Sequence, residues 1–159
     1  MKNGFALLGL LAVLSAPTFG AAEIGCPDLA QAVQVASCPS DEELRYTFTG
    51  YCSDNNRSYK GDADVCTDFE RYRQLKNVAL WESADGEFSA YVSCDRAPAS
   101  VRGARPGAVR VARQGSITIL SCGYGDGLTF SHRRRGTCRV AEAAKACGSD
   151  SAACRASCD

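Results

Sequence analysis

The sequence predicts an α+β fold: a disulfide-rich antiparallel sheet of four to six strands with an N-terminal helix and a short helical C-terminal tail. The chain has 159 residues and ten cysteines, and so many cysteines in a short chain are typical of a disulfide framework in an exported protein. Short β-branched and aromatic runs alternate with glycine-rich turns in the middle of the chain, as in antiparallel sheets. Helical spacing of apolar residues near the N-terminus and an alanine-rich C-terminal segment favour a helix toward each end.

The first 22 residues carry the pattern of a secretory signal peptide. Lys2 supplies a positive charge, and Gly4 to Leu14 form an apolar run of the right length. The small residues Gly20 to Ala22 offer a cleavage site after Ala22. This run is too short to span a bilayer, and no second apolar stretch approaches the length that a membrane helix needs. We expect residues 1–22 to be a signal peptide and residues 23–159 to form a single secreted domain without a membrane span.

All ten cysteines follow the expected signal peptide, and we expect them to form disulfides. The shortest spacing is C-x-x-x-C, and the chain has one histidine, so a zinc site is poorly supplied with ligands. Spacing alone leaves the pairing open. Cys154 and Cys158 lie four residues apart on an expected helix, so we expect each to bond to a cysteine elsewhere. The ten positions are Cys26, Cys38, Cys52, Cys66, Cys94, Cys122, Cys138, Cys147, Cys154 and Cys158.

The N-terminal part of the domain combines helix and strand signals. Pro27 can begin a helix, and apolar residues at helical spacing predict that it runs over Pro27–Ser37. Ser40 and Glu43 match the capping-box pattern of a helix N-terminus. Aromatic and β-branched residues dominate 46–51, however, so we expect the capping box to close only a turn before a strand.

A hairpin is the clearest local prediction in the sequence. Polar residues predict a loop over 53–68, and a short helix is expected over 68–76. Val78–Glu82 and Glu87–Cys94 then read as two strands around a turn at 84–86, because apolar and polar residues alternate along the second run.

The C-terminal half is predicted to hold further strands and then helices. Pro, Gly and Arg residues predict an exposed loop over Arg96–Gly107. Helices are expected over 138–146, with Thr137 as a cap, and from about 149 to Ser157. Three more strands are expected, at Ala108–Ala112, Ser116–Cys122 and Leu128–His132.

Charge is distributed unevenly along a chain whose formal net charge is zero. Glu23 to Asp95 contain six Lys or Arg and fourteen Asp or Glu, whereas Arg96 to Asp159 contain eleven and four. The preferred interpretation is that the two halves pack together and neutralise each other. The alternative is a basic binding face. Its main candidate residues are Arg133, Arg134 and Arg135 with Arg139, which could grip anionic glycans, phospholipid headgroups or nucleic acid phosphates. A second basic stretch without any acid could do the same, through Arg96, Arg102, Arg105, Arg110 and Arg113.

His132 is the only histidine and therefore the main candidate for a catalytic base. A Ser-His-Asp hydrolase would need it beside a nucleophile and a carboxylate. A ribonuclease-like enzyme could combine it with one of the arginines at 133–135 and with Glu82 or Glu87. His132 alternates with Phe130 along its strand, which predicts a partly buried, structural residue. No segment carries a trusted catalytic or cofactor signature, so we expect a non-enzymatic protein without a cofactor.

Metal binding and glycosylation each have one candidate segment. Asp62, Asp64 and Asp68 suggest a calcium loop, but the glycine and glutamate of the EF-hand pattern are missing, so we expect a solvated loop and no metal site. The glycine-rich segment 123–127 lacks the lysine of a phosphate-binding loop and is expected to be a turn. Asn56 begins an Asn-Arg-Ser sequon in a polar segment, so we expect it to be glycosylated in a eukaryotic source.

The chain resembles the broad class of small secreted cysteine-rich proteins, notably fungal effectors. The resemblance lies in the expected signal peptide, the cysteine content and the lack of catalytic motifs. The resemblance covers composition and layout, and no named family's motif matches residue by residue. It implies a protein that binds a host protein or an extracellular glycan and interferes with host defence, with cross-links that resist host proteases. Nucleic acid is not an expected partner. Two alternatives stay open: a secreted ribonuclease-like hydrolase that uses His132, and an inhibitor or toxin that presents a rigid loop such as Arg96–Gly107.

Overall fold

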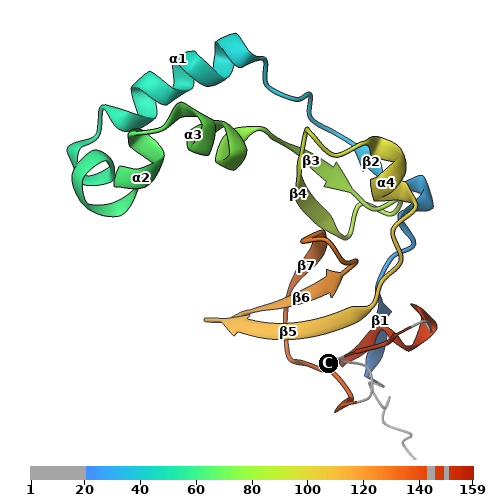
Figure 1. Ribbon diagram of the computed structural model, residues 1–159. Coiled ribbons are helices and arrows are strands. Elements are labelled where there is room, and N and C mark those ends of the chain that lie inside the picture. The colour runs from blue at the N-terminus through green and yellow to red at the C-terminus, as the bar shows by residue number, and fades with distance from the viewer. Residues whose placement is uncertain (1–20, 143–145, 149–150) are drawn as a thin grey trace, which may run out of the picture.

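The computed structural model of the protein contains a long sheet, a second small sheet and an arm of helices (Figure 1). It describes residues 21–142, 146–148 and 151–159. The expected signal peptide lies outside the described residues, apart from its last two positions. Helices and antiparallel sheets occur together, so the α+β class is confirmed.

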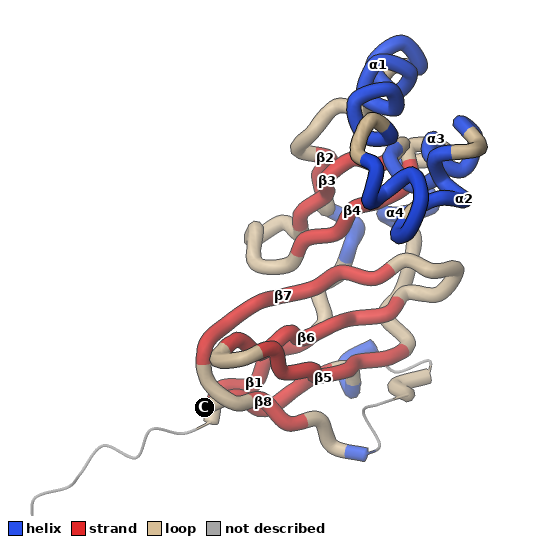
Figure 2. The backbone as a smooth tube through the Cα atoms, turned by 90° about the vertical axis from the view of Figure 1, so that its left-hand side faces the viewer, coloured by secondary structure: helices blue, strands red, loops and turns tan. Residues whose placement is uncertain are grey.

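The long sheet has six strands, all paired antiparallel, in the order β2-β3-β4-β7-β6-β5. β4 and β7 pair only where Ser89 lies opposite Ser131, so the sheet consists of two halves, β2-β3-β4 and β7-β6-β5, joined at one point (Figure 2). The strands are β2 (Val33–Gln34), β3 (Val78–Glu82), β4 (Ser89–Ser93), β5 (Ala108–Gln114), β6 (Ile117–Gly123) and β7 (Thr129–Arg135).

The predicted hairpin of β3 and β4 is confirmed, and its turn is fixed by one buried serine. Ser83 accepts a hydrogen bond from the backbone N–H of Phe88 at 3.0 Å and donates to the Asp85 carboxylate at 2.5 Å. Gly86 follows with a φ of 74°, which glycine adopts without strain. The strands expected at 108–112, 116–122 and 128–132 are also confirmed, as β5, β6 and β7.

The predicted N-terminal helix over Pro27–Ser37 is wrong. The segment forms one 3-10 turn, η1 (Leu29–Gln31), and then extends as β2 beside β3. Asp28 caps the turn by accepting from the backbone N–H of Ala30 at 3.0 Å. Leu29 and Ala32 are both buried in the core. The chain becomes extended after these two buried residues. The backbone N–H of Val35 then donates to the Leu80 carbonyl of β3.

The predicted helical C-terminal tail is also wrong. β8 (Cys138–Arg139) and β9 (Arg155–Cys158) form a three-stranded sheet with β1 (Ala22–Gly25), in the order β1-β9-β8. A short 3-10 turn, η4 (Ser151–Ala153), precedes β9. Alanine content favoured a helix here, but pairing with the distant β1 and the Cys138–Cys158 disulfide holds the tail extended. Part of the helix expected over 138–146 lies outside the described residues.

The arm of helices replaces the strand expected at 46–51 and much of the loop expected at 53–68. Ser40 and Glu43 form the predicted capping box, which opens a helix of three turns instead of a single turn. Phe48 and Tyr51 lie on the side of this helix that meets Phe69 and Tyr72, with ring centroids 5.2 to 5.6 Å apart. The arm contains α1 (Asp41–Cys52), a π-helical turn η2 (Arg57–Gly61), α2 (Ala63–Cys66) and the predicted α3 (Phe69–Lys76).

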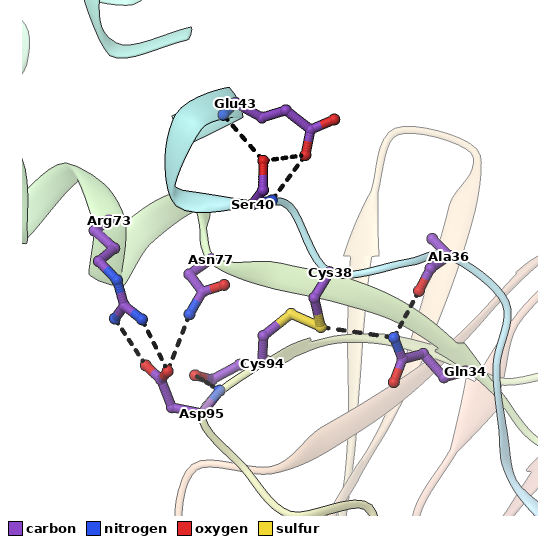
Figure 3. Close-up of a disulfide and its surroundings, with 10 residues drawn as sticks. Gln34, Ala36, Cys38, Ser40, Glu43, Arg73, Asn77, Cys94 and Asp95 are labelled. Atoms are coloured by element: carbon purple, nitrogen blue, oxygen red, sulfur yellow. Dashed lines mark hydrogen bonds and ion pairs between the residues drawn. A yellow bond between two sulfur atoms is a disulfide. The ribbon is translucent and has the colours of Figure 1, made fainter. Parts of the chain in front are cut away.

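Five disulfides cross-link the described residues, which confirms a disulfide-rich framework. Cys154 and Cys158 bond to different partners, as expected. The bridge between Cys38 and Cys94 joins the base of the arm to the end of β4 (Figure 3). The other four are Cys26–Cys122, Cys52–Cys66, Cys138–Cys158 and Cys147–Cys154. Among the helices that the structure describes, none has the length and apolar character needed to cross a membrane.

The hydrophobic core covers one face of the long sheet. Trp81, Val92, Leu120 and Phe130 project into it from four different strands and are all buried. η1, the small sheet and a short helix, α4 (Pro98–Arg102), supply the other side of the core. α4 lies within the expected loop 96–107, so that loop is partly helical and partly buried. The opposite face of the sheet remains exposed and carries the candidate site.

A candidate anion-binding face

Three arginines gather on the exposed face of β5, β6 and β7. Along β6, Thr118, Leu120 and Cys122 point into the core, so the residues between them belong to the exposed face. Residues directly opposite one another in paired strands share a face. The register therefore places Arg110, Arg133 and Arg135 on the exposed side, opposite Ser121, Ile119 and Ile117 respectively.

Only two members of the predicted arginine triplet belong to this face. Arg134 lies opposite the buried Thr118 and points to the other side of the sheet. Its guanidinium donates to the carbonyls of Arg135 at 3.2 Å and of Asp159 at 2.7 Å, so it ties β7 to the C-terminal residue. The third arginine of the face is Arg110 on β5, which the sequence placed in a separate acid-free basic stretch and did not bring together with Arg133 and Arg135. Alternation along β5, read together with the register of the β5–β6 hairpin, is the signal that could have found it.

The face also carries a row of hydroxyl groups. Ser89, Ser131 and Ser121 lie opposite one another on β4, β7 and β6, and Arg110 continues the row on β5. The hydroxyls of Ser121 and Ser131 are 3.3 Å apart. We define the basic face as Arg110, Ser121, Ser131, Arg133 and Arg135. It combines positively charged guanidinium groups with neutral hydroxyl groups that can both donate and accept hydrogen bonds.

These arginines lack acidic partners. β5, β6 and β7 contain five arginines and no Asp or Glu. In the part of the chain that the structure describes, no carboxylate lies within 4 Å of Arg110, Arg133 or Arg135, although other arginines have such partners. The arginines that pair are Arg57, Arg71, Arg73, Arg105 and Arg155.

Neutralisation between the acidic and basic halves is therefore partial. Arg105 pairs with Asp28 at 3.0 Å, and Arg155 pairs with Glu23 at 3.4 Å, so both pairs join the two halves of the chain. The arm, which carries many of the acidic residues, lies beyond the β2-β3-β4 half and away from β5 (Figures 1 and 2). Among the described residues no carboxylate pairs with Arg110, Arg133 or Arg135, so their positive charge stays on the basic face.

A cavity of about 220 Å³ opens at one end of the basic face. Arg110, Ser121 and Thr129 line it from β5, β6 and β7, and the glycine-rich segment 123–127 closes it. That segment is the turn that the sequence predicts, with Gly125, Asp126 and Gly127 all at positive φ.

His132 has a structural position. It lies on the core side of β7, opposite the buried Leu120, and its side chain is 16% exposed. Its Nδ1 donates to the Glu87 carbonyl at 2.9 Å, and its ring packs 5.3 Å from that of Phe88. The Glu87 carboxylate is 3.9 Å away. The prediction of a partly buried histidine agrees with this position.

The groups proposed to act with His132 are divided between the two faces of the sheet: Glu87 lies beside the histidine, and Arg134 shares its side of β7. Arg133 and Arg135 lie on the opposite face of the sheet, as does Glu82, which is paired with Ser89. The serine nearest in the fold, Ser83, is buried and donates to Asp85. This hydrogen bond, with a second from the Glu87 backbone, holds the pKa of the Asp85 carboxyl below its usual range. Ser83 and Asp85 therefore form a turn, not a nucleophile with its base.

The three aspartates of the suspected calcium loop have other partners. Asp62 accepts from the Tyr51 hydroxyl at 2.7 Å, which raises the pKa of Tyr51. Asp64 pairs with Arg71 at 3.5 Å, and Asp68 caps α3 and pairs with Arg71 at 3.6 Å. No group of three or more candidate ligands lies together among the described residues. The carboxylates hold the arm together.

Two further candidates lie outside the basic face. Asn56 is exposed at the start of η2, and its backbone N–H donates to Asp54 at 2.8 Å, so its glycosylation stays a prediction. In the loop 96–107, Arg96 donates to the Asp126 carbonyl and Arg102 to the Ala32 carbonyl. These contacts hold the loop against the body of the protein, so it does not project as an inhibitory loop would.

The arm carries two adjoining shallow grooves, of about 720 and 790 Å³. Both are lined by Tyr46, Thr47, Tyr72 and Lys76, and Tyr46 is 81% exposed. The sequence interpretation missed them because it placed a strand where α1 lies. They contain no arrangement of acid, base and nucleophile.

Comparison with models of protein families, with curated proteins and with solved structures finds no match to this chain. Function is therefore inferred from the residues of the site themselves.

Proposed function

We propose that the protein is a secreted, non-enzymatic binding protein that holds an anionic extracellular glycan on its basic face. The observation that carries this proposal is the set of three arginines, Arg110, Arg133 and Arg135, which lie without carboxylate partners on an exposed sheet face. Guanidinium groups form charge-assisted, often bidentate hydrogen bonds with carboxylate and related oxyanions.

The spacing of these arginines suits a polymer with repeated charges. Arg133 and Arg135 are two residues apart on one strand, which corresponds to about 7 Å. Arg110 lies two strands away and in register with Ser131, so its backbone is about 12 Å from that of Arg133 and about 16 Å from that of Arg135. A single small anion could touch only one of them. A chain with an anionic group on successive sugars could meet all three, while its hydroxyls bond to Ser121 and Ser131.

A glycan fits this face better than a nucleic acid does. Binding of single-stranded nucleic acids relies on aromatic side chains on which successive bases stack. The exposed face carries one large aromatic residue, Tyr91, which is 75% exposed on β4. Besides the arginines, Glu82 and Gln114, its polar groups are hydroxyls, which match the hydroxyls of sugars.

The disulfides support an oxidising, extracellular site of action. Five cross-links in a chain of this size are typical of secreted proteins. In a host tissue, a protein that masks or sequesters an anionic glycan interferes with the defence responses that depend on it. The effector role belongs to this proposal. A host protein stays the second candidate partner, as the sequence predicts.

Heparin-column chromatography tests the proposal. An Arg110→Ala, Arg133→Ala, Arg135→Ala variant is expected to elute at much lower salt than the unaltered protein. It has lost the three guanidinium groups that contact the anionic groups of heparin. An Arg45→Ala, Lys60→Ala, Arg71→Ala variant changes the net charge equally but alters exposed residues of the arm. It is expected to elute almost unchanged. Equal losses in both variants would show that net charge alone causes retention and would overturn the proposal.

A further inference from the structure

We infer that the cavity beside Arg110 binds the carboxylate of a single uronic acid residue of the glycan. This inference rests on the proposed function and names the sugar that the basic face recognises. The cavity, of about 220 Å³, is smaller than the roughly 300 to 1,000 Å³ of pockets for drug-sized ligands. It therefore has room for one sugar ring and not for an oligosaccharide.

Among the residues that the structure describes, Arg110 is the only charged side chain that lines the cavity. It is exposed, and within the described ranges no carboxylate lies within 4 Å of its guanidinium. Asp126, in the turn beside the cavity, is not among the lining residues, and its carbonyl accepts from Arg96 at 2.6 Å. A guanidinium is a planar fork whose donors match the two oxygens of a planar carboxylate. A sugar acid is therefore the ligand that this fork recognises best.

Two hydroxyls and the glycine-rich turn supply the rest of the cavity. Ser121 and Thr129 line it from β6 and β7, and each can donate to or accept from a sugar hydroxyl. Gly125 and Gly127 line the turn side, and a Cβ built on either would meet no atom within 4 Å. The glycines thus leave open the space in which we place the ring.

Gly123 allows the cavity to be filled without damage to the backbone. It lies in β6 between Ala108 and Thr129 and is not at positive φ. A Cβ at this position would contact Ala108 Cβ at 3.8 Å and its carbonyl at 3.9 Å, which are ordinary contacts. A valine at 123 suits a strand and would project into the cavity. Gly25→Val in β1 is the matched control, because Gly25 also lies in a strand and a Cβ there would meet no atom within 4 Å.

The test compares two polymers by calorimetry or surface binding: oligogalacturonate, which carries only carboxylates, and dextran sulfate, which carries only sulfates. Gly123→Val is expected to weaken oligogalacturonate binding at least tenfold and to leave dextran sulfate binding within twofold. Arg110→Lys, which keeps the charge but removes the fork, is expected to weaken oligogalacturonate binding to a similar degree. Gly25→Val should bind both polymers as the unaltered protein does.

Unchanged oligogalacturonate binding in a folded Gly123→Val variant would overturn the uronate site, as would equal losses for both polymers. The arginine triple variant separates this failure from failure of the proposed function. If it loses both polymers while Gly123→Val binds them normally, the basic face stands and only the cavity assignment is wrong. If the triple variant still binds both, the proposed function itself is wrong.

Discussion

Single residues of the basic face owe their position to strand register. Arg133, Arg134 and Arg135 are consecutive, yet pleating sends Arg134 to the opposite side of the sheet from its neighbours. Arg110, distant in sequence, joins the other two because β5 and β6 place it opposite Ser121. We therefore expect Arg134→Ala to leave heparin retention nearly unchanged, whereas Arg133→Ala lowers it.

Glu43 makes stability depend on pH through the capping box. Its carboxylate accepts from the backbone N–H of Ser40 at 2.7 Å and from the Ser40 hydroxyl at 3.0 Å, and these bonds lower the pKa of Glu43 from its usual 4.5. A lowered pKa means that the ionised carboxylate is preferred in the folded state. Its contribution is therefore present above pH 4.5 and is lost as the pH falls through the lowered value.

Glu43→Gln tests this linkage by urea denaturation at pH 7 and at pH 3. The unaltered protein is expected to be the more stable of the two at pH 7, and the difference between them should shrink at pH 3, because more of the Glu43 carboxylate is protonated there. A difference in unfolding free energy that is the same at both pH values would contradict the role of the carboxylate.

His132 is expected to support the hairpin and not to catalyse a reaction. His132→Ala removes the hydrogen bond to the Glu87 carbonyl and the packing on Phe88, so the free energy of unfolding should fall by about 1 to 2 kcal/mol. Retention on heparin should stay the same. Assays for nuclease activity provide the decisive comparison: an activity present in the unaltered protein and abolished in a folded variant would make His132 a catalytic base.

At the scale of secondary-structure elements, we expect the junction between the arm and the sheet to be the part of the fold that is disrupted most easily. Besides the Cys38–Cys94 disulfide, Asp95 accepts from both terminal nitrogens of Arg73 at 3.2 Å and from Asn77 at 3.1 Å (Figure 3). Arg73 also bonds Asp41 at the start of α1, at 3.4 Å. The carboxylates around it raise the pKa of Arg73, so it stays charged. One arginine thus connects α1, α3 and β4.

Removal of the Cys38–Cys94 bridge should loosen the arm as a unit. A Cys38→Ser, Cys94→Ser variant is expected to lose about 2 to 5 kcal/mol of stability and to be cleaved first within 41–76 in limited proteolysis. Cys52→Ser, Cys66→Ser, which removes a bridge internal to the arm, is the comparison. Cleavage of the first variant at sites spread over β5 to β7 would show that the arm is not an independent unit.

Local signals sufficed for some elements and misled for others. The β3–β4 hairpin was predictable because alternation and turn residues are both local. Helix α1 was not predictable in this way, because Tyr46, Phe48 and Tyr51 look like strand residues. The aromatic rings of α3 against which Phe48 and Tyr51 pack are distant in sequence. The tail looked helical because nothing nearby in sequence reveals that β9 pairs with β1. Contacts between distant segments decided both.

At the scale of the whole molecule, charge is separated in space as well as in sequence. The basic face lies on β5 to β7, and the arm with its many carboxylates lies at the other end (Figure 1). The uneven charge was visible in the sequence, and so was part of the site, at Arg133 and Arg135. The contribution of Arg110 and the cavity required the strand register, which the sequence did not reveal in advance.

The complete set of disulfides predicts the chemical behaviour of the mature protein. Thiol labelling of native material is expected to modify no cysteine, and peptide mapping should recover the five pairs described above. Reduction should then unfold the chain. Labelled thiols in native, folded material would contradict the framework and reopen the question of metal ligation.

The most direct test of the account is a nuclear magnetic resonance titration of the isotope-labelled protein with heparin oligosaccharides. We predict that the largest amide shifts occur at Arg110, Ser121, Ser131, Arg133 and Arg135, with small changes along α1 and α3. Shifts confined to the grooves of the arm, or no shifts at all, would contradict the claim that the exposed face of β5, β6 and β7 is the binding surface.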